Sequence, residues 1–190
     1  MSDLEDRLAD LTSGDEARAE AAAVSLAEFG DAATPSLIAL LDSPEADTRW
    51  WAARTLASLP SLDPGVLPPL LADAAPEVRQ CAALALCSHP SQDAVPPLIG
   101  ALSDEDSLTA ELSAKALTFV GEPAVESLLQ VLKDAPQSAR IHAMHALSEI
   151  ADPRSIPAMI AVMSEESAML HYWADAGLER LGVNMIYLKP

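Results

Sequence analysis

The sequence predicts an all-α fold, a right-handed α-solenoid (superhelix) of six antiparallel helix pairs with about 30 residues per repeat. The first observation is a leucine that recurs every 30 or 31 residues, at Leu26, Leu56, Leu86, Leu117, Leu147 and Leu178. The second is an apolar residue fifteen positions before each of these, at Leu11, Leu41, Leu71, Leu102, Leu132 and Met163. A fixed period of this length is typical of stacked repeats, in which each unit contacts only its neighbours.

Composition is the third observation. Hydrophobic residues make up 50% of the chain but aromatic residues only 4%. Alanine and leucine, which favour helices, therefore dominate over the β-branched and aromatic residues that favour strands.

The repeats are expected to form one elongated domain over residues 1–182. Their approximate limits follow from the leucine period and from prolines at the joints, where a helix stops without loss. The predicted units are about 1–30, 31–60, 61–91, 92–121, 122–152 and 153–182. Residues 183–190 break the pattern and are predicted to be an extended C-terminal tail. The tail either covers the last unit or, alternatively, inserts into a partner or pairs with a second copy.

Each unit is predicted to contain a short helix followed by a longer one. The first helices, such as 35–41, 95–102 and 156–163, often carry proline in the first turn, where a missing N–H does no harm. The second helices carry a small residue four positions before the repeat leucine, at Ala52, Ala82, Ser113, Ala143 and Ala174. These small side chains let a neighbouring helix approach closely.

Charge argues against several kinds of partner. Eleven Lys and Arg against 29 Asp and Glu give a net charge of −18, which repels nucleic acid and anionic membranes. No apolar run reaches the roughly 18 residues of a membrane span, and the N-terminus is acidic where a signal peptide is basic. We therefore expect a soluble, cytoplasmic protein. Cys81 and Cys87 are expected to be buried free thiols.

The sequence of the repeats resembles that of a known family. A short helix, an acidic turn and an Arg followed by Ala-Ala-x-x-Leu, as in 49–56 and 79–86, resembles the HEAT repeat. The short spacing is similar to that of phycobilisome-lyase-like HEAT repeats, and the resemblance covers residues 3–182. It implies a ladder in which an Asp ending each turn caps and orients an Arg six residues later. Asp73 with Arg79 and Asp134 with Arg140 match, whereas Ser43 with Arg49, Asp104 with Ala110 and Glu165 with His171 match in part.

The candidate partner-binding residues stand six and two positions before the repeat leucine, one helical turn apart and outside the packing stripe. The resemblance implies that they line the concave face. They are Trp50, Arg54, Gln80, Leu84, Glu111, Lys115, Ile141, His145 and Tyr172, preceded by Glu20 and Val24 in the first unit. Trp50, Leu84, Ile141 and Tyr172 would be exposed anchors. The alternative is that Trp50 and Tyr172 fold back as core.

Other aromatic residues have different expected roles. Trp51 and Trp173 lie closer to the buried stripe and are expected in the core. Trp50 and Trp51 beside Arg49 and Arg54 could also form a cation–π cluster that binds a planar or acidic ligand.

Catalytic and metal sites are not predicted. His142, His145 and Glu149 share one helix face, but no second group of ligands completes a zinc site. No phosphate loop, nucleophile elbow or His-Glu dipeptide occurs, and no cofactor is expected.

The resulting hypothesis is a non-enzymatic scaffold or adaptor that holds a segment of a partner protein, with basic or mixed apolar and basic character, on its concave face. The alternative, implied by the resemblance, is an accessory subunit of a phycobilin lyase-like complex that attaches a chromophore. The oligomeric state stays open.

Overall fold

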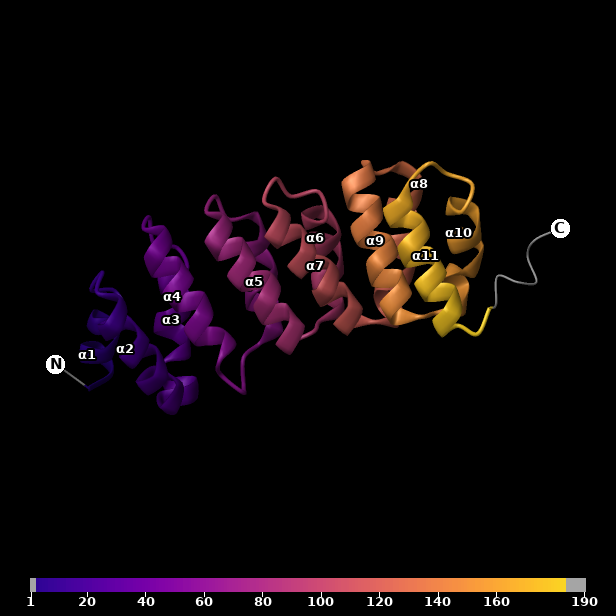
Figure 1. Cartoon of the computed structure of the whole chain (residues 1–190). Coiled ribbons are helices and arrows are strands. Elements are labelled where there is room, and N and C mark those ends of the chain that lie inside the picture. The colour runs from indigo at the N-terminus through magenta and orange to yellow at the C-terminus, as the bar shows by residue number, and fades with distance from the viewer. Residues whose placement is uncertain (1–2, 184–190) are drawn as a thin grey trace. The chain divides into compact units, whose positions relative to one another are not determined.

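Helices form throughout residues 3–183, the part of the chain that the computed structural model describes (Figure 1). No strand occurs among these residues. The α-helices are α1 (Asp3–Leu11), α2 (Glu16–Phe29), α3 (Thr34–Leu40), α4 (Ala46–Ala57), α5 (Pro76–Ser88), α6 (Val95–Ala101), α7 (Ser107–Val120), α8 (Val125–Asp134), α9 (Gln137–Ile150), α10 (Ile156–Val162) and α11 (Ala168–Arg180). Short 3-10 helices precede several of them: η1 (Gly30–Ala32), η2 (Pro64–Val66), η3 (Pro68–Ala72), η4 (Gln92–Ala94), η5 (Glu122–Ala124) and η6 (Pro153–Ser155).

The elements pair as the repeat period predicts. The pairs are α1 with α2, α3 with α4, η3 with α5, α6 with α7, α8 with α9, and α10 with α11. The all-α repeat fold is therefore confirmed, and each of the six predicted repeats holds one pair. Of the predicted tail, only Val183 lies within the described residues.

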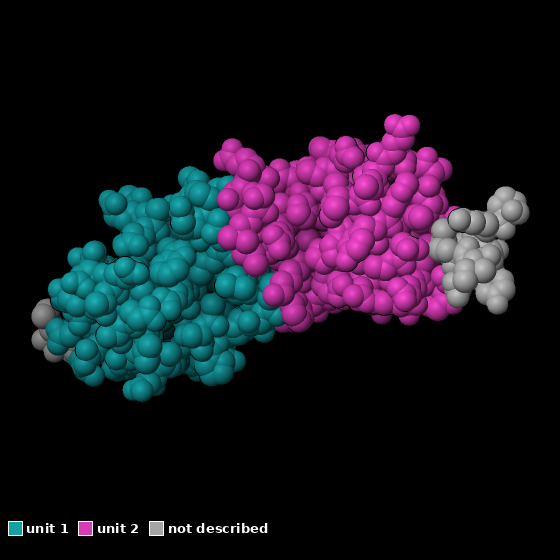
Figure 2. Space-filling model, in the orientation of Figure 1, with its two compact units in different colours: residues 1–89 teal, residues 90–190 magenta. Residues whose placement is uncertain are grey.

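The chain divides into two compact units, residues 1–89 and residues 90–190 (Figure 2). Unit 1 contains the pairs from α1 to α5, and unit 2 contains those from α6 to α11. Within each unit, successive second helices lie side by side: α2, α4 and α5 in unit 1, and α7, α9 and α11 in unit 2.

The third pair departs from the helix pattern in its first member. Residues 64–72 form the 3-10 helices η2 and η3 in place of an α-helix. The prolines alone do not explain this winding, because Pro96 and Pro97 occupy the same place in α6, which is α-helical, and Leu67 before Pro68 keeps α geometry. Leu67 and Leu70 are buried nonetheless, so the segment fills the same place in the core.

The core is the predicted stripe. All six repeat leucines are 0% exposed, and the small residues four positions before them, including Ser113, are buried as well. Trp51 is buried as expected, whereas Trp173 is only half-buried.

Arginines tie the turns of successive repeats together. Arg49 Nε and Nη2 donate to the Asp73 carboxylate at 2.7 Å each, and Arg49 Nη1 donates to the Ser43 carbonyl at 2.9 Å. Arg140 repeats this arrangement: its Nε donates to the Leu132 carbonyl at 2.8 Å and its Nη2 to Glu165 Oε1 at 2.6 Å. Each guanidinium thus binds the backbone of its own turn and the carboxylate of the next.

The predicted ladder is therefore corrected in its connectivity. Arg79 Nη1 donates to the backbone carbonyl of Asp73 at 2.9 Å, while the Asp73 carboxylate binds Arg49 and accepts from the Ala75 N–H. Asp134 accepts from Gln130, and no bond joins it to Arg140 within residues 3–183. The arginine side chain is long enough to reach the following turn, which a prediction confined to one repeat leaves out.

Two leucines of α5 give a matched test of the core. Leu86→Ala should lower the free energy of unfolding by about 2–5 kcal/mol, because it leaves a cavity in a fully buried site. Leu84→Ala, at a side chain that is 54% exposed, should change it by less than about 0.5 kcal/mol. Urea unfolding followed by circular dichroism measures both. Equal effects would contradict the assignment of Leu86 to the core.

The Arg49 to Asp73 ion pair should make stability depend on acid pH. The hydrogen bond from Arg49 holds the pKa of the Asp73 carboxyl below its ordinary value. The pair therefore stabilises the fold above the unfolded pKa of about 3.9, and this contribution is lost as pH falls through the lowered pKa. Asp73→Asn should cost about 1.5–3 kcal/mol at pH 7, and the gap from wild type should close in acid. Asp175→Asn, at an exposed position on α11, is the control.

Candidate partner-binding face

One row of side chains on each second helix faces away from the core. The row consists of positions nine, six and two before the repeat leucine and two after it, which share a helix face. On α7 these are Leu108, Glu111, Lys115 and Phe119. We call these rows, taken in each unit by itself, the second-helix face of that unit.

Exposed apolar side chains gather on this face. Eight large apolar side chains are exposed within residues 3–183, and six of them lie on the second-helix face: Val24, Leu84, Leu108, Phe119, Met169 and Tyr172. The other two, Ile38 and Ile160, belong to first helices. Val24 and Leu84 lie in unit 1 and the other four in unit 2. Exposed apolar side chains on one face of a unit are typical of an interaction site.

The predicted site residues differ in exposure. Leu84 and Tyr172 are 54% and 61% exposed, so Tyr172 does not fold back as core. Glu111 and Lys115 are exposed as well. Half-buried positions are Trp50, Arg54, Gln80, Ile141 and His145.

In unit 1 the predicted cation–π cluster forms around Arg54. Its guanidinium carbon lies 5.3 Å from the Trp50 ring centroid and 5.0 Å from that of Trp51, whose rings meet edge to face. Arg54 also donates to both oxygens of Glu20 at 2.6 and 2.8 Å. Because Glu20 neutralises Arg54, an anionic ligand would have to displace that carboxylate. Arg49 binds Asp73 and is not part of the cluster.

Cys81 lies near this cluster. Burial raises the pKa of its thiol to about 11, and the charge of Arg54 opposes the shift. At neutral pH Cys81 is therefore a protonated thiol and a poor nucleophile.

In unit 2 the equivalent place holds an aromatic cluster. The His145 ring stacks on Trp173 with centroids 3.9 Å apart, and Tyr172 meets Trp173 edge to face at 4.8 Å. Burial lowers the pKa of both His142 and His145, while Glu111 on α7 opposes the shift in each. Both imidazoles are therefore neutral near pH 7 and add no positive charge to this part of the face.

No group of three His, Cys, Asp or Glu side chains within residues 3–183 is close enough to hold a metal ion, so His142, His145 and Glu149 do not form such a group. None of the helices described is both long and apolar enough to cross a bilayer.

Three site residues escape the sequence argument. Leu108, Phe119 and Met169 lie one helical turn beyond the positions chosen from sequence. Extending the same spacing by one turn in each direction finds them. The repeat pattern marks only buried positions. It therefore does not reveal the grooves that lie between first helices.

Helix pairs stacked through buried leucines, with an exposed row on the second helices, define an α-solenoid repeat protein. The chain matches the family of HEAT repeats over residues 3–72 and 64–137. Since the match covers more than half of the sequence, the chain belongs to the HEAT-repeat family.

Two curated relatives share part of their sequence with this chain. A phycobilisome maturation protein from Synechococcus elongatus is 30% identical over 101 residues, 53% of this chain and 49% of the relative. Phycocyanobilin lyase subunit beta from Pseudanabaena tenuis is 36% identical over 78 residues, 41% of this chain and 28% of the relative. The chain thus spans about half or less of the length of these relatives.

Solved structures with the same fold include a complex of CpcE and CpcF of phycocyanin lyase from Nostoc sp. PCC7120. The TM-score is 0.58 at 23% identity, covering 75% of this chain and 96% of that one. A designed armadillo repeat protein in complex with the peptide (KR)4 has a TM-score of 0.54 at 19% identity, covering 95% and 100%. At these identities the likeness establishes the fold alone.

The half-buried stack of His145 on Trp173 should make unit 2 sensitive to mild acid. Its folded pKa lies below the unfolded value of about 6.5. Protonation therefore favours the unfolded state, and stability should fall as pH drops from about 6.5 through the folded pKa. NMR titration of the His145 ring should give a midpoint below 6.5, and His145→Phe, which keeps a stacked ring, should reduce the pH dependence of unfolding. A midpoint at or above 6.5 would contradict the stack.

Proposed function

We propose that this chain is a protein-binding accessory subunit of a phycobilin lyase-like complex, in which it contributes binding rather than catalysis. The observation that carries the proposal is its similarity to phycobilisome maturation protein and to phycocyanobilin lyase subunit beta from two organisms. The shared fold with the CpcE and CpcF complex adds support, since that structure joins two proteins.

The second-helix face supplies the binding surface in this proposal. Leu84, Phe119 and Tyr172 each expose more than half of their side chain, so covering them with a partner removes apolar area from water. Glu111 lies in the same row of α7 as Phe119, and the net charge of −18 attracts a basic segment over a distance. Apolar anchors would then set affinity, while charge would set the rate of encounter and the choice of partner.

A second candidate is a general scaffold with no pigment in its complex. The likeness to a designed repeat protein that binds (KR)4 favours it, because the same fold there binds a strongly basic peptide. The acidity of the present chain suits such a peptide equally well. The two candidates share the binding face and differ only in the chromophore.

The binding face can be tested by recovery of partners from the source cell. Leu84→Ala, Phe119→Ala and Tyr172→Ala combined should lose a partner that wild type retains, since truncated anchors typically cost more than 1 kcal/mol each. Ile38→Ala with Ile160→Ala is the matched control, because these side chains are exposed on first helices. Helicity should be the same in all three proteins, and high salt should weaken recovery.

Adding phycocyanobilin to the recovered complex then separates the two candidates. A bound pigment, seen as a change in visible absorbance that persists through gel filtration, supports the lyase-like complex. A salt-sensitive partner without pigment rejects it in favour of the scaffold. Equal recovery with the triple variant rejects the second-helix face for both.

A further inference from the structure

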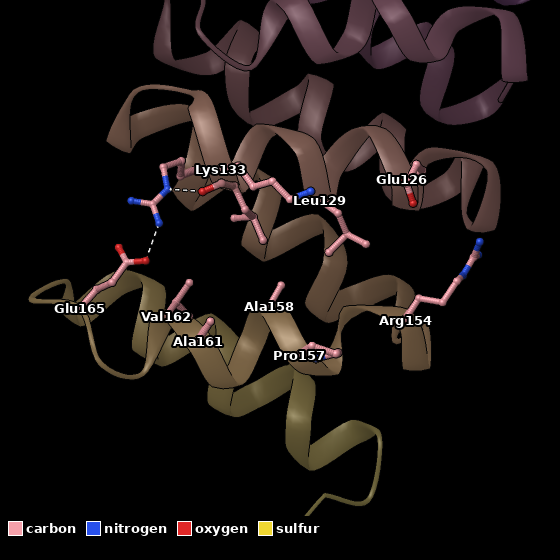
Figure 3. A pocket seen from close by; sticks show the side chains of 11 residues that line it. Glu126, Leu129, Lys133, Arg154, Pro157, Ala158, Ala161, Val162 and Glu165 are labelled. Atoms are coloured by element: carbon pink, nitrogen blue, oxygen red, sulfur yellow. Dashed lines mark hydrogen bonds and ion pairs between the residues drawn. The ribbon is translucent and has the colours of Figure 1, made fainter.

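Grooves remain between neighbouring first helices. In unit 2, second helices pack along one another, whereas the first helices α6, α8 and α10 touch much less. One groove lies between α3 and η3 in unit 1, and two more flank α8 in unit 2. The groove between α8 and α10 encloses about 400 Å³ (Figure 3). Its walls are α8 and α10, and Arg140 of α9, which is not in the exposed row of that helix, closes one end.

Small side chains of α10 create this groove. Ala158 and Ala161 stand opposite Leu129 of α8, and neither alanine fills the space between the helices (Figure 3). Leu132 and Val162 complete an apolar lining. A volume of this size suits a few side chains of a bound segment. The groove is therefore suited to a short linear segment rather than to the flank of a whole domain.

Charged residues stand at both ends and on the rim. The Arg140 to Glu165 ion pair lies at one end, and Arg154 with Glu126 at the other (Figure 3). Lys133 of α8 stands between them and is exposed. Within residues 3–183, Lys133 has no ion-pair partner, whereas each of the eight arginines binds a carboxylate or a carbonyl. Its charge is available to a ligand.

The three described grooves differ in their cations. In the α8 to α10 groove Arg140 is paired with Glu165 and Arg154 with Asp152, which leaves Lys133 as the lining cation outside an ion pair among the described residues. The groove between α3 and η3 carries Asp42 and Asp73 with no cation, and the one between α6 and α8 carries Asp134 with none. In a chain of net charge −18, an exposed, unpaired lysine over an apolar groove favours a bound segment that brings a carboxylate.

We propose that the α8 to α10 groove docks a short segment of a second partner protein, in which apolar side chains stand next to Asp or Glu. The apolar side chains would cover Leu129, Ala158 and Ala161, and the carboxylate would pair with Lys133. The proposal rests on this groove alone and does not depend on the function proposed for the second-helix face. With both faces occupied, the chain would join an acidic segment to a basic one.

Peptide display tests the groove. A library of random dodecapeptides is selected on the full wild-type chain and counter-selected on Ala161→Trp, which fills the groove from an exposed position. The enriched peptides should combine Leu, Ile or Phe with Asp or Glu. Fluorescence anisotropy of one synthesised winner should give an affinity that falls at least about tenfold with Ala161→Trp, because the added ring takes the space of the ligand.

Charge reversal provides the matched pair of variants. Lys133→Glu should weaken the same peptide by about fivefold to tenfold. Lys115→Glu, at an exposed lysine of α7 on the second-helix face, should leave its affinity unchanged. Both are surface changes, and equal helicity and thermal midpoints show that the fold is retained. The proposal is overturned by a basic consensus, by no enrichment over Ala161→Trp, or by equal loss with both lysine variants.

Discussion

Close approach of successive second helices is the constraint on which the rest of the structure depends. In a stack of repeats, each repeat buries apolar surface only against its neighbours, so every repeat must supply the same contact. The repeat leucines supply it, and the small residues one turn before them, such as Ala82, Ser113 and Ala143, set the distance between helices. This packing uses one side of each second helix and leaves the opposite row without a partner. The exposed rows that include Leu84 in unit 1 and Phe119 and Tyr172 in unit 2 are thus a consequence of the stripe that packs the repeats within each unit.

The arginines have a different role, which is to bind polar backbone groups at the turns. The last carbonyls of a helix lack partners within it, and a guanidinium has enough donors to bind them and a carboxylate together. Arg49 and Arg140 do so, each joining its own turn to the acid of the next repeat. The contact is charge-assisted and partly buried, so it is stronger than an exposed ion pair. The unit that has Ala110 at this position lacks that link, and its turn is instead organised by Asp106, which accepts from Thr109.

Sequence reasoning reaches the buried positions better than the exposed ones. The period gave the pairs, the buried leucines and the buried Trp51, because burial repeats with the structure. It did not give the 3-10 winding of residues 64–72, since Pro68 and Pro69 match Pro96 and Pro97 of an α-helical repeat. Nor did it give the partner of Arg49, which lies 24 residues away. It also placed both Arg49 and Arg54 beside the tryptophans, whereas Arg54 is the arginine that stacks on them. The difference depends on which carboxylate each arginine reaches, Asp73 or Glu20, and this is a property of three-dimensional packing.

The distribution of cations explains how one acidic chain can offer one surface suited to a basic partner segment and another suited to an acidic one. Only 11 of its residues are Lys or Arg, and the arginines bind carboxylates or carbonyls within the described structure. Their charges are neutralised locally and contribute little to recognition. Two described lysines remain, Lys115 on the second-helix face and Lys133 beside the first-helix groove. Lys115 stands in the same row as Glu111, whereas Lys133 lies over an apolar groove whose carboxylates already face arginines. The same residue type therefore has a different effect on each face, because the sign of a surface is set by what neutralises its charges rather than by composition.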